Sequence, residues 1–303
     1  MNARQVHEMK VILAVDGSEH STAAARLLRD LPLPYGSTID VLAVLVPRNA
    51  SDHANLEQAL ADAKATLSGA KAKVSTELLT GYPAEQISEY AAKNVPDLIV
   101  LGAKGRRATL GILLGGVVQQ IVEYADDPVL VVRAPYEGLQ RILIVSDGSI
   151  HSQRAMRYLG QFPIPDMSEV HALHVLPPMP SPAMIARSWP AGSETMAPVP
   201  SYETEEMLAR QAEEEERQGK KILAETVETL GDYGIEAKGV LLRGDAATEI
   251  IEYANQNEIG LIVAGSRGLS QMRRLLLGSL SRKLVHYASC SVLIVKGGDR
   301  DMA

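Results

Sequence analysis

Two octapeptides decide how this chain folds: LIVLGAKG at residues 98–105 and LIVAGSRG at residues 261–268. Each is an apolar run that ends in the glycine spacing GxxG, and the two lie 163 residues apart. Nine residues separate each octapeptide from a pair of small residues, Gly-Gly at 115–116 and Gly-Ser at 278–279, which precedes a stretch with helical spacing. This order is typical of a buried strand, a glycine loop and the start of a helix.

The match continues outside the glycines. The run VILAVDGSEHS at residues 11–21 returns as ILIVSDGSIHS at residues 142–152, which places Asp16 over Asp147 at an offset of 131 residues. Because this offset is smaller than the one between the octapeptides, the second copy contains an insertion of 32 residues. Repeats of this length are too long to be solenoid units, so we predict two homologous domains.

The predicted domains cover residues 1–137 and 138–303, and the insertion follows the second strand of the second domain. Residues 177–200 contain seven prolines, so they cannot form a regular helix or strand. The charged segment at 202–228 places acidic residues four positions before basic ones, as in a solvated helix. We expect a loop that leads into a long helix. The alternatives are a lid over the neighbouring site or a contact with a protein partner through Met179, Met184 and Trp189.

The composition excludes several classes of function. The chain has 303 residues, a formal net charge of -7, one Phe and one Trp, so it offers neither a basic stripe nor aromatic platforms for nucleic acid. Its single cysteine, Cys290, cannot form an internal disulfide or a cysteine-ligated zinc site, and we interpret it as a small buried hydrophobe. The sequence lacks a run near the ~20 apolar residues that cross a bilayer, and its first ten residues do not have the apolar core expected of a signal peptide. We expect a cytoplasmic protein without membrane or nucleic-acid partners.

Short β-rich runs alternate with helical stretches, which predicts an α/β fold with parallel strands and helices on both faces of the sheet. The strands are rich in Val, Ile and Leu, as a sheet buried on both sides requires. The predicted strands are residues 11–15, 39–46, 74–79, 98–101 and 129–132, and then 142–145, 170–175, 237–242, 261–264 and 292–295. The predicted helices of the first half are residues 21–29, 56–67, 84–92 and 117–124.

In an open parallel sheet, ligands bind beyond the carboxyl ends of the strands, where the strand order reverses. Asp16 and Asp147 each end a first strand, and Gly102 and Gly265 each end a fourth. If these strands are neighbours, each aspartate faces a glycine loop across one crevice, where its carboxylate could hold ribose hydroxyls or a metal ion. We also expect the glycines to adopt φ values that other residues avoid and to bring backbone N–H groups close to a ligand.

The helix that begins after each loop adds to the expectation of an anion site. Its unpaired N–H groups and positive dipole end suit a phosphate, and the Ser279 hydroxyl can donate to a phosphate oxygen or cap the helix. Gly116 keeps the backbone cradle in the first domain but lacks the hydroxyl. Each feature alone also has a purely structural explanation, because Asp-Gly-Ser is a plausible turn in which Ser18 or Ser149 caps the next helix. The recurrence of these features in one fixed order favours a functional explanation.

In these features the sequence resembles the universal stress proteins, in the form that carries two such domains in tandem. ATP-binding members of that family carry GxxG, nine residues, and then Gly with Ser or Thr, a pattern that the second domain matches in full. The resemblance places the aspartate near the ribose and a metal ion, and a valine of the second strand against adenine. The nucleotide-binding residues that it implies in the second domain are Asp147, which is also the metal ligand, Val175, Ala264, Gly265, Arg267, Gly268, Gly278, Ser279 and Leu280. Those implied in the first domain are Asp16, Val44, Leu101, Gly102, Lys104, Gly105, Gly115, Gly116 and Val117.

The resemblance also implies a five-stranded sheet of order 3-2-1-4-5 in each domain, with the fifth strands paired across the domain interface. Two tandem domains can satisfy that pairing within one chain, and a further homodimer stays open. The ligand would be ATP or another adenine nucleotide, with Mg²⁺ as an optional companion. Because Gly116 departs from the Ser or Thr of the pattern, we expect the second domain to be the stronger site.

The sequence favours a binding protein over an enzyme, since it contains neither GxxxxGK[ST] nor GxGxxG. His20 and His151 fall in the first turn of a helix and are expected to point to solvent. His171 and His174 lie three apart on a strand, so they face opposite sides. We expect a nucleotide-binding stress-response regulator without catalytic residues. The alternatives are a slow ATPase or nucleotidyl-transfer enzyme that uses Asp147 to hold a metal, and a nucleotide-free scaffold that works through the insertion.

Overall fold

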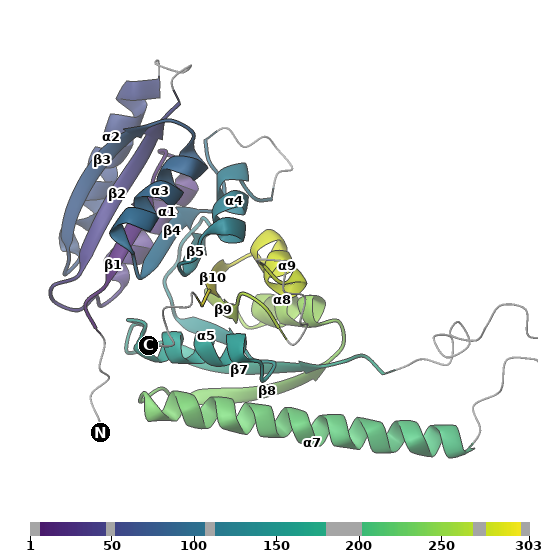
Figure 1. The fold of residues 1–303 in the computed structure, drawn as a ribbon. Helices are drawn as coiled ribbons and strands as arrows, with labels where there is room; N and C mark the ends of the chain where they lie inside the picture. Colours follow the sequence, from purple (N-terminus) through teal and green to yellow (C-terminus); the bar gives the residue numbers. More distant parts are fainter. Residues whose placement is uncertain (1–6, 47–51, 107–112, 180–201, 269–276, 298–303) are drawn as a thin grey trace, which may run out of the picture.

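The computed structural model describes residues 7–46, 52–106, 113–179, 202–268 and 277–297. They form one ten-stranded sheet in the order β3-β2-β1-β4-β5-β10-β9-β6-β7-β8 (Figure 1). Its strands are β1 (Lys10–Ala14), β2 (Thr38–Leu45), β3 (Lys73–Thr80), β4 (Leu98–Gly102), β5 (Val129–Val132), β6 (Arg141–Val145), β7 (Glu169–Leu176), β8 (Ala237–Arg243), β9 (Leu261–Gly265) and β10 (Ser291–Val295). Each half has the order 3-2-1-4-5, so the predicted topology is confirmed.

The fifth strands of the two halves form the seam of the sheet, as predicted. Among the described strand pairs, β5 and β10 run antiparallel, with Val131 opposite Val292, and the others are parallel. The carboxyl ends of the strands therefore lie at one edge of the sheet in the first domain and at the opposite edge in the second. Each domain keeps its own crevice.

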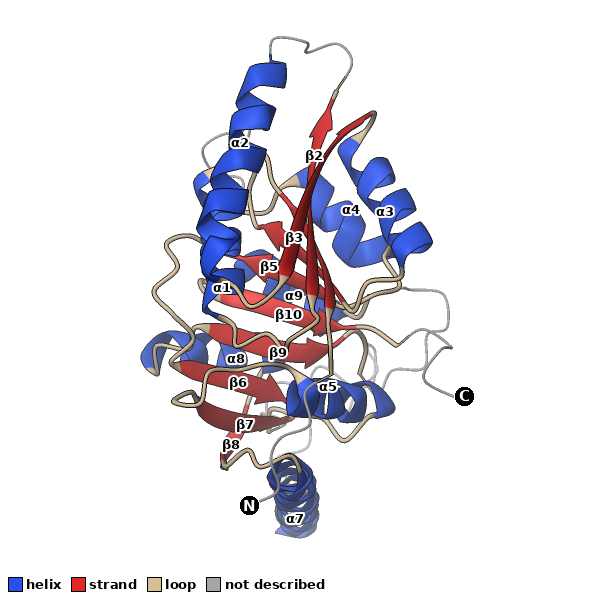
Figure 2. Ribbon diagram, turned by 90° about the vertical axis from the view of Figure 1, so that its left-hand side faces the viewer, coloured by secondary structure: helices blue, strands red, loops and turns tan. Residues whose placement is uncertain are grey.

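Helices cover both faces of the sheet, which explains why its strands are apolar on both sides (Figure 2). One face carries α1 (Glu19–Asp30), α2 (His53–Thr66), α5 (Ile150–Gln161) and α7 (Tyr202–Asp232), with a short 3-10 turn (Leu67–Gly69) after α2. The other face carries α3 (Pro83–Asn94), α4 (Gly116–Tyr124), α8 (Ala246–Gln256) and α9 (Ser279–Tyr287). Two hydrophobic cores result, one under each layer of helices.

The Asp-Gly-Ser turn after the first strand starts the next helix in the same way in both domains. Gly17 and Gly148 have φ angles of 77° and 76°, a conformation that glycine adopts without steric cost. Ser18 and Ser149 then cap α1 and α5, because each side chain accepts a hydrogen bond from the amide three residues later. The predicted caps are confirmed, and such a cap stabilises a helix by about 1 kcal/mol.

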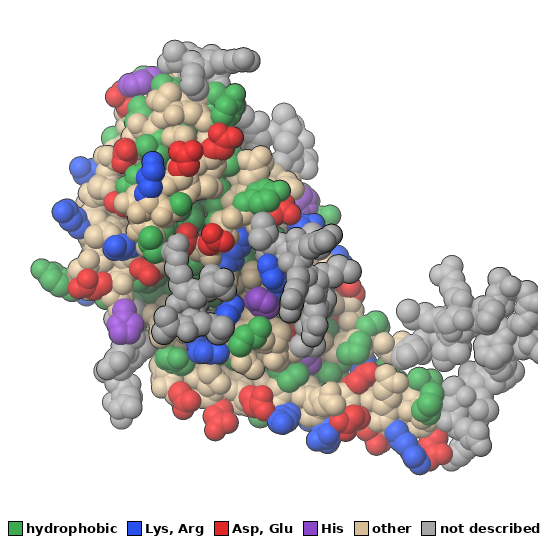
Figure 3. Space-filling view, in the orientation of Figure 1, with side chains coloured by type: hydrophobic (Ala, Val, Ile, Leu, Met, Phe, Trp, Pro, Cys, Tyr) green, Lys and Arg blue, Asp and Glu red, His purple; other side chains and the backbone are tan. Residues whose placement is uncertain are grey.

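The second helix is the element that differs most between the domains, since α2 has 14 residues and α7 has 31. The N-terminal turns of α7 extend beyond the sheet (Figure 1), and acidic and basic side chains lie side by side along it (Figure 3). Glu216 pairs with Lys220 at 2.6 Å, the predicted spacing of four. The predicted proline-rich loop falls almost wholly in residues 180–201, outside the described residues. None of the described helices combines the length and the apolar character needed to span a membrane.

Candidate functional site

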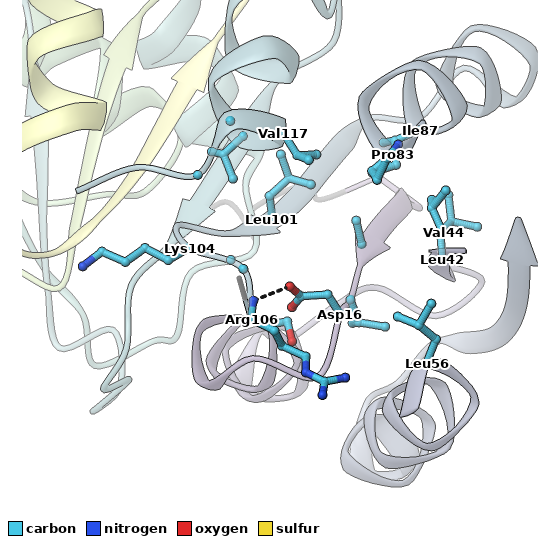
Figure 4. Close-up of a pocket in the computed structure, with 18 of the residues that line it drawn as sticks. Asp16, Leu42, Val44, Leu56, Pro83, Ile87, Leu101, Lys104, Arg106 and Val117 are labelled. Carbon is cyan, nitrogen blue, oxygen red and sulfur yellow. Dashed lines mark hydrogen bonds between the residues drawn. The ribbon is translucent and has the colours of Figure 1, made fainter. Parts of the chain in front are cut away.

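The first domain holds a cavity with a volume of about 730 Å³ at the carboxyl ends of β1, β2 and β4 (Figure 4). The cavity lies where the strand order reverses, between β1 and β4. The nine residues that the sequence singled out in this domain all line it: Asp16, Val44, Leu101, Gly102, Lys104, Gly105, Gly115, Gly116 and Val117. The fold therefore brings together residues from four separate segments of the chain.

Asp16 fastens the glycine loop to the end of β1. Its Oδ2 accepts a hydrogen bond from the amide of Arg106 (2.8 Å), and its Oδ1 accepts one from the amide of Ser18 (3.1 Å). A Cβ at Gly105 would lie 2.6 Å from Oδ2, so a side chain there would displace the carboxylate. Because a carboxylate oxygen can accept more than one bond, Asp16 can still receive a ligand hydroxyl or a cation.

The loop glycines are needed for close packing rather than for an unusual backbone conformation. A Cβ at Gly102 would lie 2.6 Å from the carbonyl carbon of His20, and a Cβ at Gly265 would lie equally close to His151. None of the four GxxG glycines has a positive φ. The expectation of φ values denied to other residues is therefore wrong. Gly102 and Gly265 are needed because α1 and α5 cross the strand ends so closely that a side chain would collide with their backbone, whereas a side chain at Gly105 or Gly268 would collide with the aspartate carboxylate.

The N-terminal end of α4 forms one end of the cavity. The amide of Gly115 donates to the carbonyl of Ala103 (2.8 Å), which holds the glycine pair against the loop. A Cβ at Gly116 would have no heavy-atom neighbour within 4 Å, so there is open space in front of it. Since the first amides of a helix lack helical partners, this end offers N–H donors and room for an anion.

The opposite end of the cavity is apolar. It is formed by Leu42 and Val44 of β2, Leu56 of α2, and Pro83 and Ile87 of α3 (Figure 4). Val44 is the one residue of this group that the sequence singled out. Leu42 could have been found as well, because it lies two positions earlier on the same strand face. The residues of α2 and α3 carry no local signal and reach the cavity through the fold.

Charged side chains in the lining have different orientations. Figure 4 shows that the ammonium group of Lys104 points away from the cavity, so this residue contributes its backbone rather than its charge. The hydroxyl of Ser18 donates to the Lys104 carbonyl (3.1 Å), which ties the loop to the start of α1. Arg106 and Asp52 also line the cavity, and no sequence pattern marked them.

The expectation that the two histidines behind the loops point to solvent is wrong. His20 is buried and His151 half-buried, because the first turn of each helix crosses over the end of the fourth strand. The Nδ1 of His20 accepts a hydrogen bond from the amide of Ala134 (2.8 Å). Burial is the largest cause that lowers the pKa of both imidazoles below the ordinary value. Near neutral pH these side chains therefore favour the uncharged form.

The second crevice repeats the frame of the first. Oδ1 of Asp147 accepts a hydrogen bond from the amide of Ser149 (3.0 Å), and a Cβ at Gly268 would lie 2.7 Å from Oδ2. The amide of Gly278 donates to the carbonyl of Ser266 (2.7 Å), as Gly115 does in the first domain. The other predicted residues are Val175 in β7, Ala264 and Gly265 at the end of β9, Arg267 after it, and Ser279 and Leu280 in the first turn of α9.

The helix above the second strand distinguishes the two crevices. The 163-residue offset places Leu56 of α2 over Gly219 of α7. Leu56 lines the first cavity, whereas Gly219 has no side chain to offer. A Cβ at Gly219 would lie 2.8 to 3.0 Å from Leu176, Leu241 and His174. Glycine at this position therefore lets α7 approach β7 and β8 closely.

A buried polar cluster lies between α7 and the sheet. Nδ1 of His174 lies 2.7 Å from the carbonyl oxygen of Ser146, so this nitrogen carries a proton and donates it. The hydroxyl of Thr226 lies 3.0 Å from Oγ of Ser146. The equivalent positions of the first domain are apolar: Val15, Ala43 and Ala63. The second domain thus has a hydrogen-bonded polar group where the first domain has three apolar core residues. One member of this group, Ser146, directly precedes Asp147.

An ion pair fixes α7 beside the second crevice. Nη1 of Arg243 lies 2.6 Å from Oε2 of Glu215 and donates to the carbonyl of Pro177 (2.9 Å). Glu215 is the equivalent of Asp52, which lines the cavity of the first domain. The ion pair therefore joins α7 to the ends of β7 and β8 at this point.

The histidines of β7 face opposite sides, as predicted. His171 contacts Glu169 (2.9 Å) and the hydroxyl of Tyr253 on α8 (2.8 Å), while His174 lies under α7. Across the described part of the chain, no three His, Cys, Asp or Glu side chains come together as a metal site. The described Cys290 is a free thiol, and burial raises its pKa to about 11. Such a thiol is a poor nucleophile at neutral pH.

Comparison with known proteins identifies the family. The sequence profile of the universal stress protein family matches residues 9–133 and again residues 138–296. The chain therefore belongs to the universal stress protein family and carries two family domains in tandem.

Individual relatives agree with this assignment. The chain is similar to universal stress protein YxiE of Bacillus subtilis, at 30% identity over 161 residues, 52% of this chain and 98% of the relative. A universal stress protein of Synechocystis is 24% identical over 244 residues, 80% of this chain and 72% of the relative. The crystal structure of a universal stress protein from Archaeoglobus fulgidus has the same fold, with a TM-score of 0.62, 21% identity, and coverage of 96% of this chain and 97% of that one.

Proposed function

We propose that the protein binds an adenine nucleotide, ATP in the first place, and that the first-domain cavity is one such site. One observation carries this proposal: a cavity of about 730 Å³ in which an apolar end faces a helix N-terminus across a glycine loop. A purine ring suits the apolar end, and a phosphate chain suits the amides at the start of α4. Asp16 lies between the two ends, where ribose hydroxyls would reach it (Figure 4).

The second crevice is proposed as a further site of the same kind. It has the same aspartate and glycine contacts and adds the exposed Ser279 at the start of α9, where a hydroxyl can donate to a phosphate. A Mg²⁺ ion bound with the nucleotide would take Asp147 or Asp16 as one ligand. Its other ligands would be phosphate oxygens and water, since Mg²⁺ usually keeps several waters and uses few protein groups.

A regulatory role fits the lining better than catalysis. The carboxylates among the described lining residues are those of Asp16 and Asp52, and Asp16 already holds the loop through two backbone amides. Nucleophilic catalysis needs a base beside a nucleophile, and the nearby His20 accepts a backbone hydrogen bond behind the loop. The protein would act through occupancy of its crevices rather than through turnover.

The first experiment is the mass spectrum of small molecules released when freshly purified protein is denatured. We expect an adenine nucleotide, or else an apo protein whose melting temperature rises when ATP is added. A ligand at one hundred times its Kd stabilises the folded state by about 2.7 kcal/mol, which a thermal melt resolves. Absence of both signals would contradict the proposal. Phosphate release that survives repurification and disappears in Asp147→Ala would point instead to an ATPase.

A further inference from the structure

The helix that begins at the small-residue pair of each crevice, α4 or α9, has its C-terminal end held by a cation of the other domain. We call α4 and α9 the cradle helices, because α4 begins at Gly116 of the first crevice and α9 at Ser279 of the second. Each runs back along the sheet, so that its last turn lies at the edge that carries the other crevice. This placement follows from the antiparallel pairing of β5 with β10.

Arg133 connects the first crevice to the cradle helix of the second domain. It follows β5, and its Nη1 donates to the carbonyl of Leu113 (3.2 Å), two residues before the glycine pair. Its Nη2 donates to the carbonyls of Val285 (2.9 Å) and His286 (3.0 Å) in the last turn of α9. One guanidinium therefore touches both the loop of the first crevice and the far end of the helix that starts the second.

Lys296 makes the reciprocal connection. It follows β10, at the position equivalent to Arg133 by the 163-residue offset. Its buried Nζ donates to the carbonyl of Glu123 (3.2 Å) and to that of Ala125 (2.5 Å), at the end of α4. An ion pair between Arg282 of α9 and Glu123 of α4 (2.9 Å) adds a direct bond between the two helices. The two caps are thus related by the symmetry of the repeat.

We propose that these reciprocal caps couple the two crevices, so that a nucleotide bound at one changes the last turn of the other domain's cradle helix and, through that helix, the affinity of the other crevice. The inference rests on the nucleotide binding proposed above.

The physical basis is that a short helix moves as one body. A cradle helix of nine residues is about 14 Å long at 1.5 Å per residue, and its amides meet the phosphates at one end while its carbonyls meet the cation at the other. A nucleotide that shifts the loop of its crevice also shifts the cation at that edge of the sheet, since Arg133 is bonded to the Leu113 carbonyl of the first loop, and the bonds of that cation to the last turn of the other cradle helix lengthen or realign. Because bonds to charged groups are sensitive to distance, that helix responds and its first amides move at the other crevice. Coupling of this kind typically changes an affinity by about 5-fold to 150-fold.

The test isolates one crevice at a time in the full-length chain. Val175→Trp fills the second crevice and leaves the first, and Val44→Trp does the reverse. Mg-ATP is then added to whichever variant binds it, and hydrogen exchange is followed in the cradle helix of the other domain. We expect ATP in the first crevice to change exchange in α9, and ATP in the second to change exchange in α4, by at least about 5-fold.

Substitution of the caps separates coupling from binding. Arg133→Gln should abolish the response of α9, and Lys296→Gln that of α4, while ATP affinity at the occupied crevice stays within about 3-fold. Arg133→Lys, which copies the residue of the second domain, should restore part of the response. Lys283→Gln is the matched control, because this exposed cation of α9 pairs with Asp245 of its own domain. Circular dichroism melts verify that each variant is folded.

The outcomes distinguish two failures. If the unmodified protein binds no adenine nucleotide, the proposed function falls and the coupling falls with it. If ATP binds but exchange in the distant cradle helix is unchanged, or changes equally with and without the cap, the coupling alone is refuted.

Discussion

The two crevices share their frame and differ in the helix that lies over the second strand. In the first domain, α2 contributes Leu56 to a cavity of about 730 Å³. In the second, Gly219 stands at that position, and α7 lies close over a polar cluster that includes Ser146 and Thr226. A duplicated fold can thus keep the glycine loop and change the apolar wall on the other side of the crevice. The pattern of glycines alone does not tell the two crevices apart in this respect.

The largest expected effect tests whether both domains need a glycine at the end of the fourth strand. Gly102→Ala and Gly265→Ala should each reduce the free energy of unfolding by about 3 kcal/mol, since a Cβ would meet helix backbone that cannot yield without shifting. Gly116→Ala should cause no loss, because its Cβ would enter open space and alanine favours the helix. Urea denaturation followed by circular dichroism measures all three. Equal stability of Gly102→Ala and Gly116→Ala would contradict the close-packing argument.

The second effect decides which crevice binds more tightly. Val44→Trp should weaken ATP binding about 100-fold at the first crevice, a loss of about 2.7 kcal/mol, because the indole occupies the apolar end. Val175→Trp is the matched change in the second domain. Titration calorimetry of both variants gives the affinity and stoichiometry of each crevice. A larger loss in Val175→Trp would support the sequence-based expectation that the second domain is the stronger site.

A third prediction concerns the hydroxyl that separates Gly116 from Ser279. Gly116→Ser should strengthen ATP binding at the first crevice about tenfold, since a hydroxyl that donates to a charged phosphate contributes roughly 1.5 kcal/mol. Ser279→Gly should weaken binding at the second crevice by a similar factor. The same calorimetric titration, repeated with AMP, shows whether the gain requires the longer phosphate chain. An equal gain for AMP would mean that the hydroxyl does not reach the distal phosphates.

The smallest expected effect is the pH dependence of stability contributed by the two capping cations, Lys296 and Arg133. Burial lowers the pKa of Lys296 from the ordinary 10.5 to about 8, so between these values the unfolded chain binds more protons than the folded one. Its contribution to stability is therefore flat below pH 8 and rises from pH 8 toward 10.5, by about 1 kcal/mol between pH 8 and 9. The difference in unfolding free energy between the unmodified protein and Lys296→Met should show this rise. Arg133→Met should show none, because arginine stays charged in that range.

Much of this structure could be predicted from local patterns. Apolar runs bounded by glycine mark strands such as β4 and β9, since a sheet buried on both faces needs continuous Val, Ile and Leu. The turn at Gly17 and the helix cap at Ser18 could be predicted because the capping hydrogen bond joins residues only three positions apart. The aspartate of each crevice was placed opposite the glycine loop by topology alone.

Other features could not be predicted, because they depend on contacts between distant segments. His20 looks like an exposed residue of a first helical turn, yet α1 crosses β4 and buries it against Ala134. Pro83 and Ile87 join the cavity from α3, and no spacing in the sequence relates them to Val44. The reason for Gly102 likewise became clear only from the approach of α1.

The repeat in the sequence was enough to establish two α/β domains, their strand order, and a pair of aspartate and glycine loops, since each follows from patterns within one repeat. The assembled fold brought the first-domain residues together around a cavity and decided which cation caps which helix. The cavity depends on how closely helices pack on the sheet, and the caps join residues more than 150 positions apart. Such contacts leave no local periodicity to read.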